Sequence, residues 1–201
     1  MIDNSSAFRM DPEVPLIVPE VNPEAILKHK GIIANPNCST IIMLMALKPI
    51  YDLARIKRII VSTYQAVSGA GKEGIDELTN QVGEYLDGKE MTANILPSAS
   101  AEKHYPIAFN LIPQIDVFCD NLYTKEEMKM VNETRKILDD YDMRITATTI
   151  RVPVYRSHSE SVNIELEHDL TLDEIKTALQ NFPGVIVQDD PETQTYPMPL
   201  Y

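Results

Sequence analysis

Cys38 is the residue whose setting best favours chemistry. It follows the turn sequence of residues 35–37 (Asn-Pro-Asn) and precedes an apolar run at residues 41–47. Proline and asparagine favour a tight turn, and Ser39 and Thr40 favour a helix start, so we expect the thiol at the N-terminus of a buried helix. Backbone N–H groups and the helix dipole favour a thiolate there, and the same donors can hold an oxyanion. This setting predicts covalent catalysis at a carbonyl carbon.

The alternative to this interpretation of Cys38 is a packing role. Most reduced cysteines are small buried hydrophobic residues, and by position alone packing is the more common role. Cys119 has no turn-to-helix setting, and we interpret it as structural. The catalytic interpretation of Cys38 is favoured when it is taken together with Gln65, Arg151 and His158. A thiol needs an acid–base partner such as histidine, and a guanidinium binds a carboxylate by two parallel hydrogen bonds.

Composition limits the classes of function. The chain has 201 residues, 44% of them hydrophobic, with a formal net charge of −12 and two cysteines. An acidic chain without a basic stripe argues against nucleic acid and against an anionic membrane surface. The longest apolar run is too short to span a bilayer, and the sequence after Met1 does not have the pattern of a signal peptide. We therefore expect a cytoplasmic protein without a disulfide framework or a metal site.

The pattern of apolar residues predicts an α/β protein. Short strands are expected at residues 31–34 and 185–187 and longer ones at 56–65, 144–155 and 160–167. The strands at residues 31–34 and 56–65, joined by the helix after Cys38, are expected to form one parallel strand–helix–strand unit. Alternation in 160–167 indicates antiparallel pairing. Further helices are expected at 72–87, from a capping box at Thr124, and from a second capping box at Thr171; residues 88–114 are expected to form a long loop.

A glycine motif at residues 69–74 matches G-x-G-x-x-G after a strand and before a helix. A dinucleotide-binding motif also needs an acidic residue about 20 positions further on, and residues 91–97 contain none. The motif is therefore interpreted as a glycine loop that approaches a ligand.

Several segments, in one order, resemble aspartate-semialdehyde dehydrogenases. They are residues 3–9 (DNSSAFR), 15–22 (PLIVPEVN), 35–40 (NPNCST), 62–69 (STYQAVSG), 104–110 (HYPIAFN) and the segment 151–158. The resemblance covers the whole chain. It implies reversible, NADPH-dependent conversion of aspartyl-4-phosphate to aspartate-4-semialdehyde with release of phosphate, on the route to lysine, methionine, threonine and, in bacteria, diaminopimelate.

The same resemblance implies a role for each site residue. Cys38 is the nucleophile that becomes a thioester, His158 is its acid–base partner, and Gln65 orients the substrate. Arg151 binds the substrate α-carboxylate and Glu126 its amino group. The remaining implied contacts are Arg9 and Lys129 with phosphate, Asn37 with substrate, and Ser68 and Gly69 with NADP. From the residues alone, Glu126 and Lys129 are equally well explained as a solvated i,i+3 pair on a helix.

The resemblance also sets the expected organisation. Residues 1–37 are expected to be the tail of a dinucleotide-binding domain with a linker, and residues 38–201 a catalytic and dimerisation domain. The fold is expected to be a mixed sheet with helices mainly on one face, like the catalytic domain of glyceraldehyde-3-phosphate dehydrogenase-like enzymes, in a homodimer with 104–119 as the candidate interface. Because the glycine-rich turn of a complete Rossmann domain is not in this sequence, we expect little dehydrogenase activity from these 201 residues alone. The alternatives are a non-catalytic oligomerisation module and a Cys–His hydrolase or acyltransferase.

Overall fold

A computed structural model describes residues 1–200. The chain forms two compact units, described separately below. Unit 1 contains Met1–Ile60, Lys129–Thr146 and Val162–Tyr196, and unit 2 contains Val61–Met128, Ala147–Ser161 and residues 197–200. The domain boundary expected at residue 37 stays a prediction.

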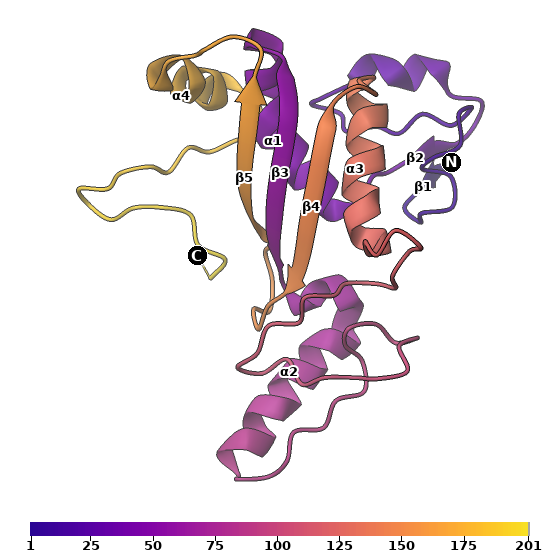
Figure 1. Cartoon of the computed structure of the whole chain (residues 1–201), viewed down its shortest axis with the longest axis vertical. Coiled ribbons are helices and arrows are strands. Elements are labelled where there is room, and N and C mark those ends of the chain that lie inside the picture. Colours follow the sequence, from indigo (N-terminus) through magenta and orange to yellow (C-terminus); the bar gives the residue numbers. More distant parts are fainter. Residues whose placement is uncertain (201) are drawn as a thin grey trace. The chain divides into compact units, whose positions relative to one another are not determined.

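The main sheet has three strands in the order β4-β3-β5 (Figure 1). Strand β3 is Ile56–Gln65, β4 is Arg144–Arg151 and β5 is Ser159–Leu166. The β-branched run of β3 confirms the strand that the sequence predicts at these residues, because branched side chains fit a pleated, half-buried surface. Strands β4 and β5 do not pair with each other, since β3 lies between them.

Two hydrogen bonds fix the directions of these strands. Val152, directly after β4, donates from its backbone N–H to the carbonyl of Gln65 at the end of β3, so β3 and β4 run parallel. Glu167, directly after β5, donates to the carbonyl of Arg55, directly before β3, so β5 runs antiparallel to β3. The sheet is therefore mixed, as expected, and the alternation in β5 correctly indicated antiparallel pairing.

One face of β3 and β4 is covered and the other is open. Odd-numbered residues 59–65 and 147–151 are buried, whereas Arg58, Tyr64 and Thr148 on the opposite face are exposed. Helix α1 spans Cys38–Leu53. The one-sided burial of β3 and β4 agrees with the expectation that helices lie mainly on one face of the sheet.

The N-terminal segment forms a second, small sheet. Strand β1 (Ile2–Asp3) pairs in parallel with β2 (Ile33–Ala34), and a 3-10 helix, η1, spans Pro23–Lys28. The prediction that residues 31–34 and 56–65 belong to one parallel unit is wrong, because β2 and β3 lie in different sheets. The physical reason is that the backbone of β2 is already paired with β1 and bridged to Leu16.

Two helices that lie mostly in unit 1 have strong local start signals. Helix α3 (Lys125–Leu138) begins after Thr124, whose Oγ1 accepts from the backbone N–H of Glu127 and whose backbone N–H donates to Glu127 Oε2. Helix α4 (Leu172–Asn181) begins after the capping box of Thr171. Both capping boxes were predicted. The short strand predicted at 185–187 is wrong: that apolar stretch has no strand partner and Ile186 is exposed. The core of this unit consists of Val14, Leu16, Val18, Val21, Ala34, Leu44 and Ile137.

The second unit has its own core around helix α2 (Gly71–Leu86), which follows the 3-10 helix η2 (Val67–Ala70). Residues 88–114 contain no helix or strand, as the three prolines there indicate. This loop packs on α2 through a core of Val67, Leu78, Leu96, Ile107, Ala108 and Ile112. The loop is therefore ordered by apolar burial rather than by regular backbone pairing.

Candidate active site

The thiol of Cys38 lies at the first residue of helix α1 and is exposed. The N-cap is Asn37, whose Oδ1 accepts hydrogen bonds from the backbone N–H groups of Ser39 at 3.0 Å and Thr40 at 3.3 Å. The predicted helix N-terminus is therefore confirmed, although Asn37 rather than a hydroxyl residue caps it. The first turn of α1 contains no acidic residue, so its positive dipole end favours a thiolate.

The cap changes one expectation about this turn. Two of the N–H groups that could have held an oxyanion, those of Ser39 and Thr40, already donate to Asn37. These two donors are therefore committed to the cap, and an oxyanion formed at Cys38 needs another donor.

In the same unit, Arg9 is connected to the Cys38 turn through Glu133 of α3. Arg9 Nη1 donates to Glu133 Oε1 at 3.1 Å, and the backbone N–H of Asn37 donates to Glu133 Oε2 at 2.6 Å. Arg9 is 8% exposed and Glu133 is 1% exposed. Lys129 lies on the same face of α3, four residues before Glu133, and is half-buried. Arg9, Asn37 and Cys38 are thus neighbours within unit 1.

The second unit collects the other predicted side chains at the end of β3. Gln65 is 1% exposed, accepts from Thr63 Oγ1 at 3.0 Å and donates from Nε2 to Glu126 Oε1 at 3.1 Å. Glu126 is 5% exposed, so its carboxylate is buried with a neutral amide as a hydrogen-bond partner. The solvated i,i+3 pair considered for Glu126 and Lys129 is therefore incorrect for Glu126, which faces Gln65 instead of solvent.

Ala66, the residue after β3, holds both His158 and Arg151 through its backbone. Its N–H donates to His158 Nδ1 at 2.9 Å, and its carbonyl accepts from Arg151 Nη1 at 2.7 Å. Because Nδ1 is an acceptor, the neutral imidazole carries its proton on Nε2. Burial lowers the pKa of His158, the positive charge of Arg151 lowers this pKa further, and Glu126 partly opposes both effects. The neutral ring is therefore the dominant form near neutral pH.

Gly69 explains part of the glycine motif. A Cβ atom at residue 69 would lie 2.7 Å from Arg151 Nη1 and 3.4 Å from His158 Cε1. A side chain at residue 69 would therefore force the guanidinium of Arg151 to move. Ser68 precedes it in η2 and donates its backbone N–H to the carbonyl of Tyr155 at 3.1 Å. Glycine at residue 69 thus leaves room for the Arg151 guanidinium at its observed position.

The predicted residues therefore fall into two groups. Unit 1 contains Cys38, Asn37, Arg9 and Lys129, and unit 2 contains Gln65, Glu126, Arg151, His158, Ser68 and Gly69. Sequence reasoning missed the roles of Ala66 and Glu133. The backbone of Ala66 leaves no signal in side-chain types, whereas Glu133 could have been found because it follows Lys129 by one helical turn.

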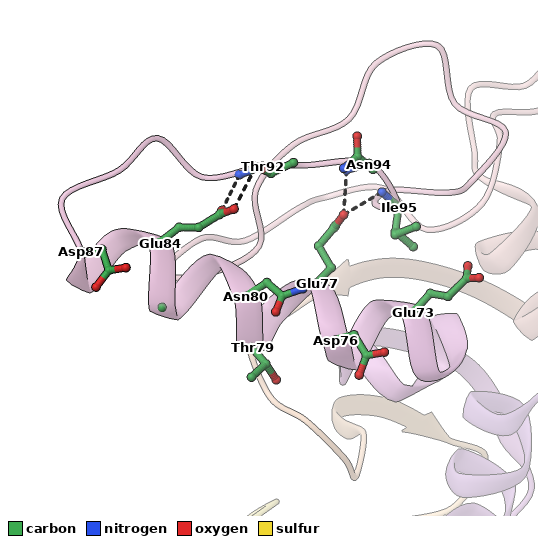
Figure 2. Close-up of a pocket in the computed structure, with 11 residues that line it drawn as sticks. Glu73, Asp76, Glu77, Thr79, Asn80, Glu84, Asp87, Thr92, Asn94 and Ile95 are labelled. Atoms are coloured by element: carbon green, nitrogen blue, oxygen red, sulfur yellow. Dashed lines mark hydrogen bonds between the residues drawn. The ribbon is translucent and has the colours of Figure 1, made fainter.

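A pocket of about 690 Å³ lies along α2 and is lined by acidic and neutral polar side chains (Figure 2). Glu84 accepts from the backbone N–H and hydroxyl of Thr92, and Glu77 Oε2 accepts from the backbone N–H groups of Asn94 and Ile95. These carboxylates hold the loop onto the helix. The pocket contains none of the predicted site residues, so we assign it a structural role.

Two further features concern residues 1–200. No helix among them is long and apolar enough to cross a membrane. Within the same range, no three histidine, cysteine, aspartate or glutamate side chains are grouped so that they could hold a metal ion.

Comparison with protein families identifies the class of protein to which the chain belongs. Residues 47–201 match the model of the semialdehyde dehydrogenase dimerisation domain, and residues 1–29 match the semialdehyde dehydrogenase NAD binding domain. The chain therefore belongs to the semialdehyde dehydrogenase family. The segments that resembled this family in the sequence include the Cys38 turn and the β3 end that carries the second group.

Individual relatives are aspartate-semialdehyde dehydrogenases. The chain is 56% identical to that of Aquifex aeolicus and 54% identical to that of Bacillus subtilis, and it spans 58% of the length of each. A crystal structure of aspartate semialdehyde dehydrogenase II from Vibrio cholerae, complexed with ASA, matches 91% of this chain and 53% of that chain, with 51% identity and a TM-score of 0.85. The predicted fold class is confirmed by this match.

Proposed function

We propose that this chain carries the catalytic cysteine and dimerisation region of an aspartate-semialdehyde dehydrogenase, which converts aspartyl-4-phosphate to aspartate-4-semialdehyde in the biosynthesis of lysine, methionine and threonine. The observation that carries the proposal is the exposed thiol of Cys38 at the first residue of α1. A buried sulfur would indicate packing, whereas an exposed one at a helix N-terminus is accessible to an acyl substrate and is favoured as a thiolate.

In the proposed mechanism, the Cys38 thiolate attacks the acyl carbon of aspartyl phosphate. The bond from carbon to the phosphate oxygen breaks, phosphate leaves with the bonding electron pair, and a thioester remains on Cys38. When NADPH is bound, it supplies a hydride to the thioester carbon. The carbon–sulfur bond then breaks, the thiolate is regenerated and the aldehyde is released.

The second group would bind and orient this substrate. Arg151 would pair with the α-carboxylate, Glu126 with the ammonium group, and Gln65, already bonded to Glu126, would orient the acyl group. His158 is the proposed acid–base partner. Its neutral tautomer presents Nε2–H, a donor that can stabilise negative charge on the substrate oxygen, which the capped N–H groups of Ser39 and Thr40 cannot.

Arg9 and Lys129 are the proposed cations for the phosphate, and Asn37 is a proposed substrate contact. Within residues 1–200, Arg9 Nε is buried and donates to no acceptor. A buried guanidinium donor without a partner is costly, and an anionic ligand would satisfy it. This supports a phosphate site at Arg9 in an otherwise acidic chain.

Ser68 and Gly69 are the proposed contacts to NADP. Gly69 is exposed, and its backbone lies directly against His158, so a nicotinamide approaching residue 69 would be close to the acid–base group. These residues therefore fit a cofactor contact.

A cytoplasmic location is proposed for the protein, in keeping with its acidic composition.

The proposal is tested on the 201-residue chain by alkylation of Cys38, because a thiol adds to an aldehyde without any cofactor. We expect aspartate semialdehyde to slow the labelling of Cys38 by iodoacetamide in a saturable manner, as followed by peptide mass spectrometry. Labelling of Cys119 in the same sample is the internal control. Equal protection by propionaldehyde would show a non-specific thiol and contradict the proposal.

A second experiment separates a dehydrogenase from a hydrolase. In the active enzyme, phosphate should stimulate the turnover of aspartate semialdehyde only if the enzyme is a dehydrogenase.

The partner in the proposed homodimer is a second copy of the chain, with residues 104–119 at the interface. Phe109, Leu111 and Phe118 in this segment are more than half exposed, and the ring of Phe109 packs on that of Tyr85 at 4.7 Å between centroids. Exposed apolar side chains of this size are typical of an interface. We expect light scattering to give a dimer mass and Leu111→Asp to shift it towards the monomer. A monomer mass for the unmodified chain at high concentration would rule out this interface.

A further inference from the structure

We propose that Glu133 is a positioning residue that fixes Arg9 and the Cys38 turn relative to each other. The inference rests on the proposed function, in which Arg9 binds the substrate phosphate and Cys38 attacks the acyl carbon next to it. Glu133 itself would touch neither the substrate nor the thiol. It would set the distance between a binding group and a nucleophile that belong to different segments of the chain.

The two oxygens of Glu133 have different partners. Oε1 accepts from Arg9 Nη1 at 3.1 Å, and Oε2 accepts from the backbone N–H of Asn37 at 2.6 Å. Arg9 is 124 residues and Asn37 is 96 residues away from Glu133 in the sequence. One buried carboxylate on a rigid helix therefore connects two loops that have no helix or strand of their own at these residues.

A carboxylate is the side chain that this position requires. Both partners are donors, and an ionised carboxylate offers acceptors on both oxygens. A glutamine has nearly the same shape, but its amide nitrogen would face one of the two donors. Because Glu133 is 1% exposed, water cannot replace the lost acceptor.

Helix α3 holds the segment of Arg9 at a second point. Lys136 Nζ donates to the carbonyls of Arg9 at 2.7 Å, Asp11 at 2.7 Å and Val14 at 2.8 Å. Burial lowers the pKa of Lys136, and Asp11 partly opposes this shift. Glu133 and Lys136 are three residues apart and share a helix face, so the backbone and the guanidinium of Arg9 are both fixed by α3.

A simpler role for Glu133 makes the opposite prediction. If the carboxylate of Glu133 only offsets the charge of Arg9, neutralising it makes the net charge around Arg9 more positive. Phosphate binding would then become stronger. If it positions Arg9, its neutralisation releases the guanidinium and weakens phosphate binding. The sign of the change therefore distinguishes positioning from charge compensation.

The test uses the 201-residue chain with inorganic phosphate as the probe. Phosphate at Arg9 should slow iodoacetamide labelling of Cys38, and the half-protecting concentration is measured by peptide mass spectrometry. We expect Glu133→Gln to raise this concentration about tenfold, the loss expected for one charge-assisted hydrogen bond. Asp140→Asn is the matched control, because Asp140 is a buried carboxylate of the same unit that accepts from Arg55 and contacts neither Arg9 nor Asn37. It should change the concentration less than twofold, about the scatter expected for an unrelated site.

The outcomes separate the two proposals. If phosphate does not protect Cys38 in the unmodified chain, the phosphate site is wrong and the role of Glu133 falls with it. If the unmodified chain is protected and Glu133→Gln binds phosphate equally well or more tightly, positioning is wrong and the proposed function stands. Circular dichroism verifies folding. If Glu133→Gln does not fold, Arg9→Lys provides the test. Lysine keeps the positive charge but lacks the two-pronged guanidinium that donates to both Glu133 and the carbonyl of Asn4. Unchanged protection of Cys38 by phosphate in Arg9→Lys would then overturn the positioning role of Glu133.

Discussion

We expect Cys38→Ser to lower the proposed phosphate-dependent turnover of aspartate semialdehyde by at least about 10⁴-fold. The hydroxyl of serine does not ionise near neutral pH, so it is a much weaker nucleophile than a thiolate. Since Cys38 is exposed, replacing sulfur by oxygen removes no core packing. The variant should therefore keep its unfolding temperature while it loses turnover.

The measurement is the formation of NADPH from aspartate semialdehyde, phosphate and NADP. Cys119→Ser is the matched control, because Cys119 is half-buried in a turn where its backbone N–H donates to the carbonyl of Tyr123. It should retain turnover. Substantial activity in Cys38→Ser would exclude a thioester on this residue and, with it, the proposed mechanism.

We expect His158→Asn to lower the same turnover by about 10²- to 10⁴-fold, the usual contribution of one acid–base group. The side-chain oxygen of asparagine can still accept from the N–H of Ala66, as His158 Nδ1 does, so the local fold should survive. What is lost is the donor at Nε2. We therefore expect a large fall in kcat with a small change in KM for the semialdehyde.

The pH dependence follows from the lowered pKa of His158. Protonation places a second proton on Nδ1, which can then no longer accept from Ala66, so the ring loses its orientation. Turnover should fall with decreasing pH only below the usual range of histidine, and this acid limb should vanish in His158→Asn. Burial raises the pKa of the nearby Glu160 to about 8, so Glu160→Gln is the control that removes any inflection near that pH. An acid limb that persists in His158→Asn would assign it to another group.

Local structure was largely predictable. The Asn-Pro-Asn turn and the apolar run after it encode the start of α1, the residue types of Thr124 and Thr171 encode two capping boxes, and the β-branched run encodes β3. These signals act within a few residues, so they are present in the sequence itself. The failures were strand assignments whose outcome depends on a distant partner: β2 pairs with β1 instead of entering the main sheet, and residues 185–187 find no partner.

The sequence by itself determined which reactive side chains are present: a thiol at a helix start, an imidazole, and the cations and carboxylate that we propose bind one small substrate. Only the tertiary structure decided how those groups are held. The backbone of Ala66 bonds both His158 and Arg151, and Glu133 joins Arg9 to the Cys38 turn. The physical reason is that residue type sets what an atom can donate, accept or attack. Which atoms meet depends on strand order and helix packing, through contacts between residues far apart in the chain.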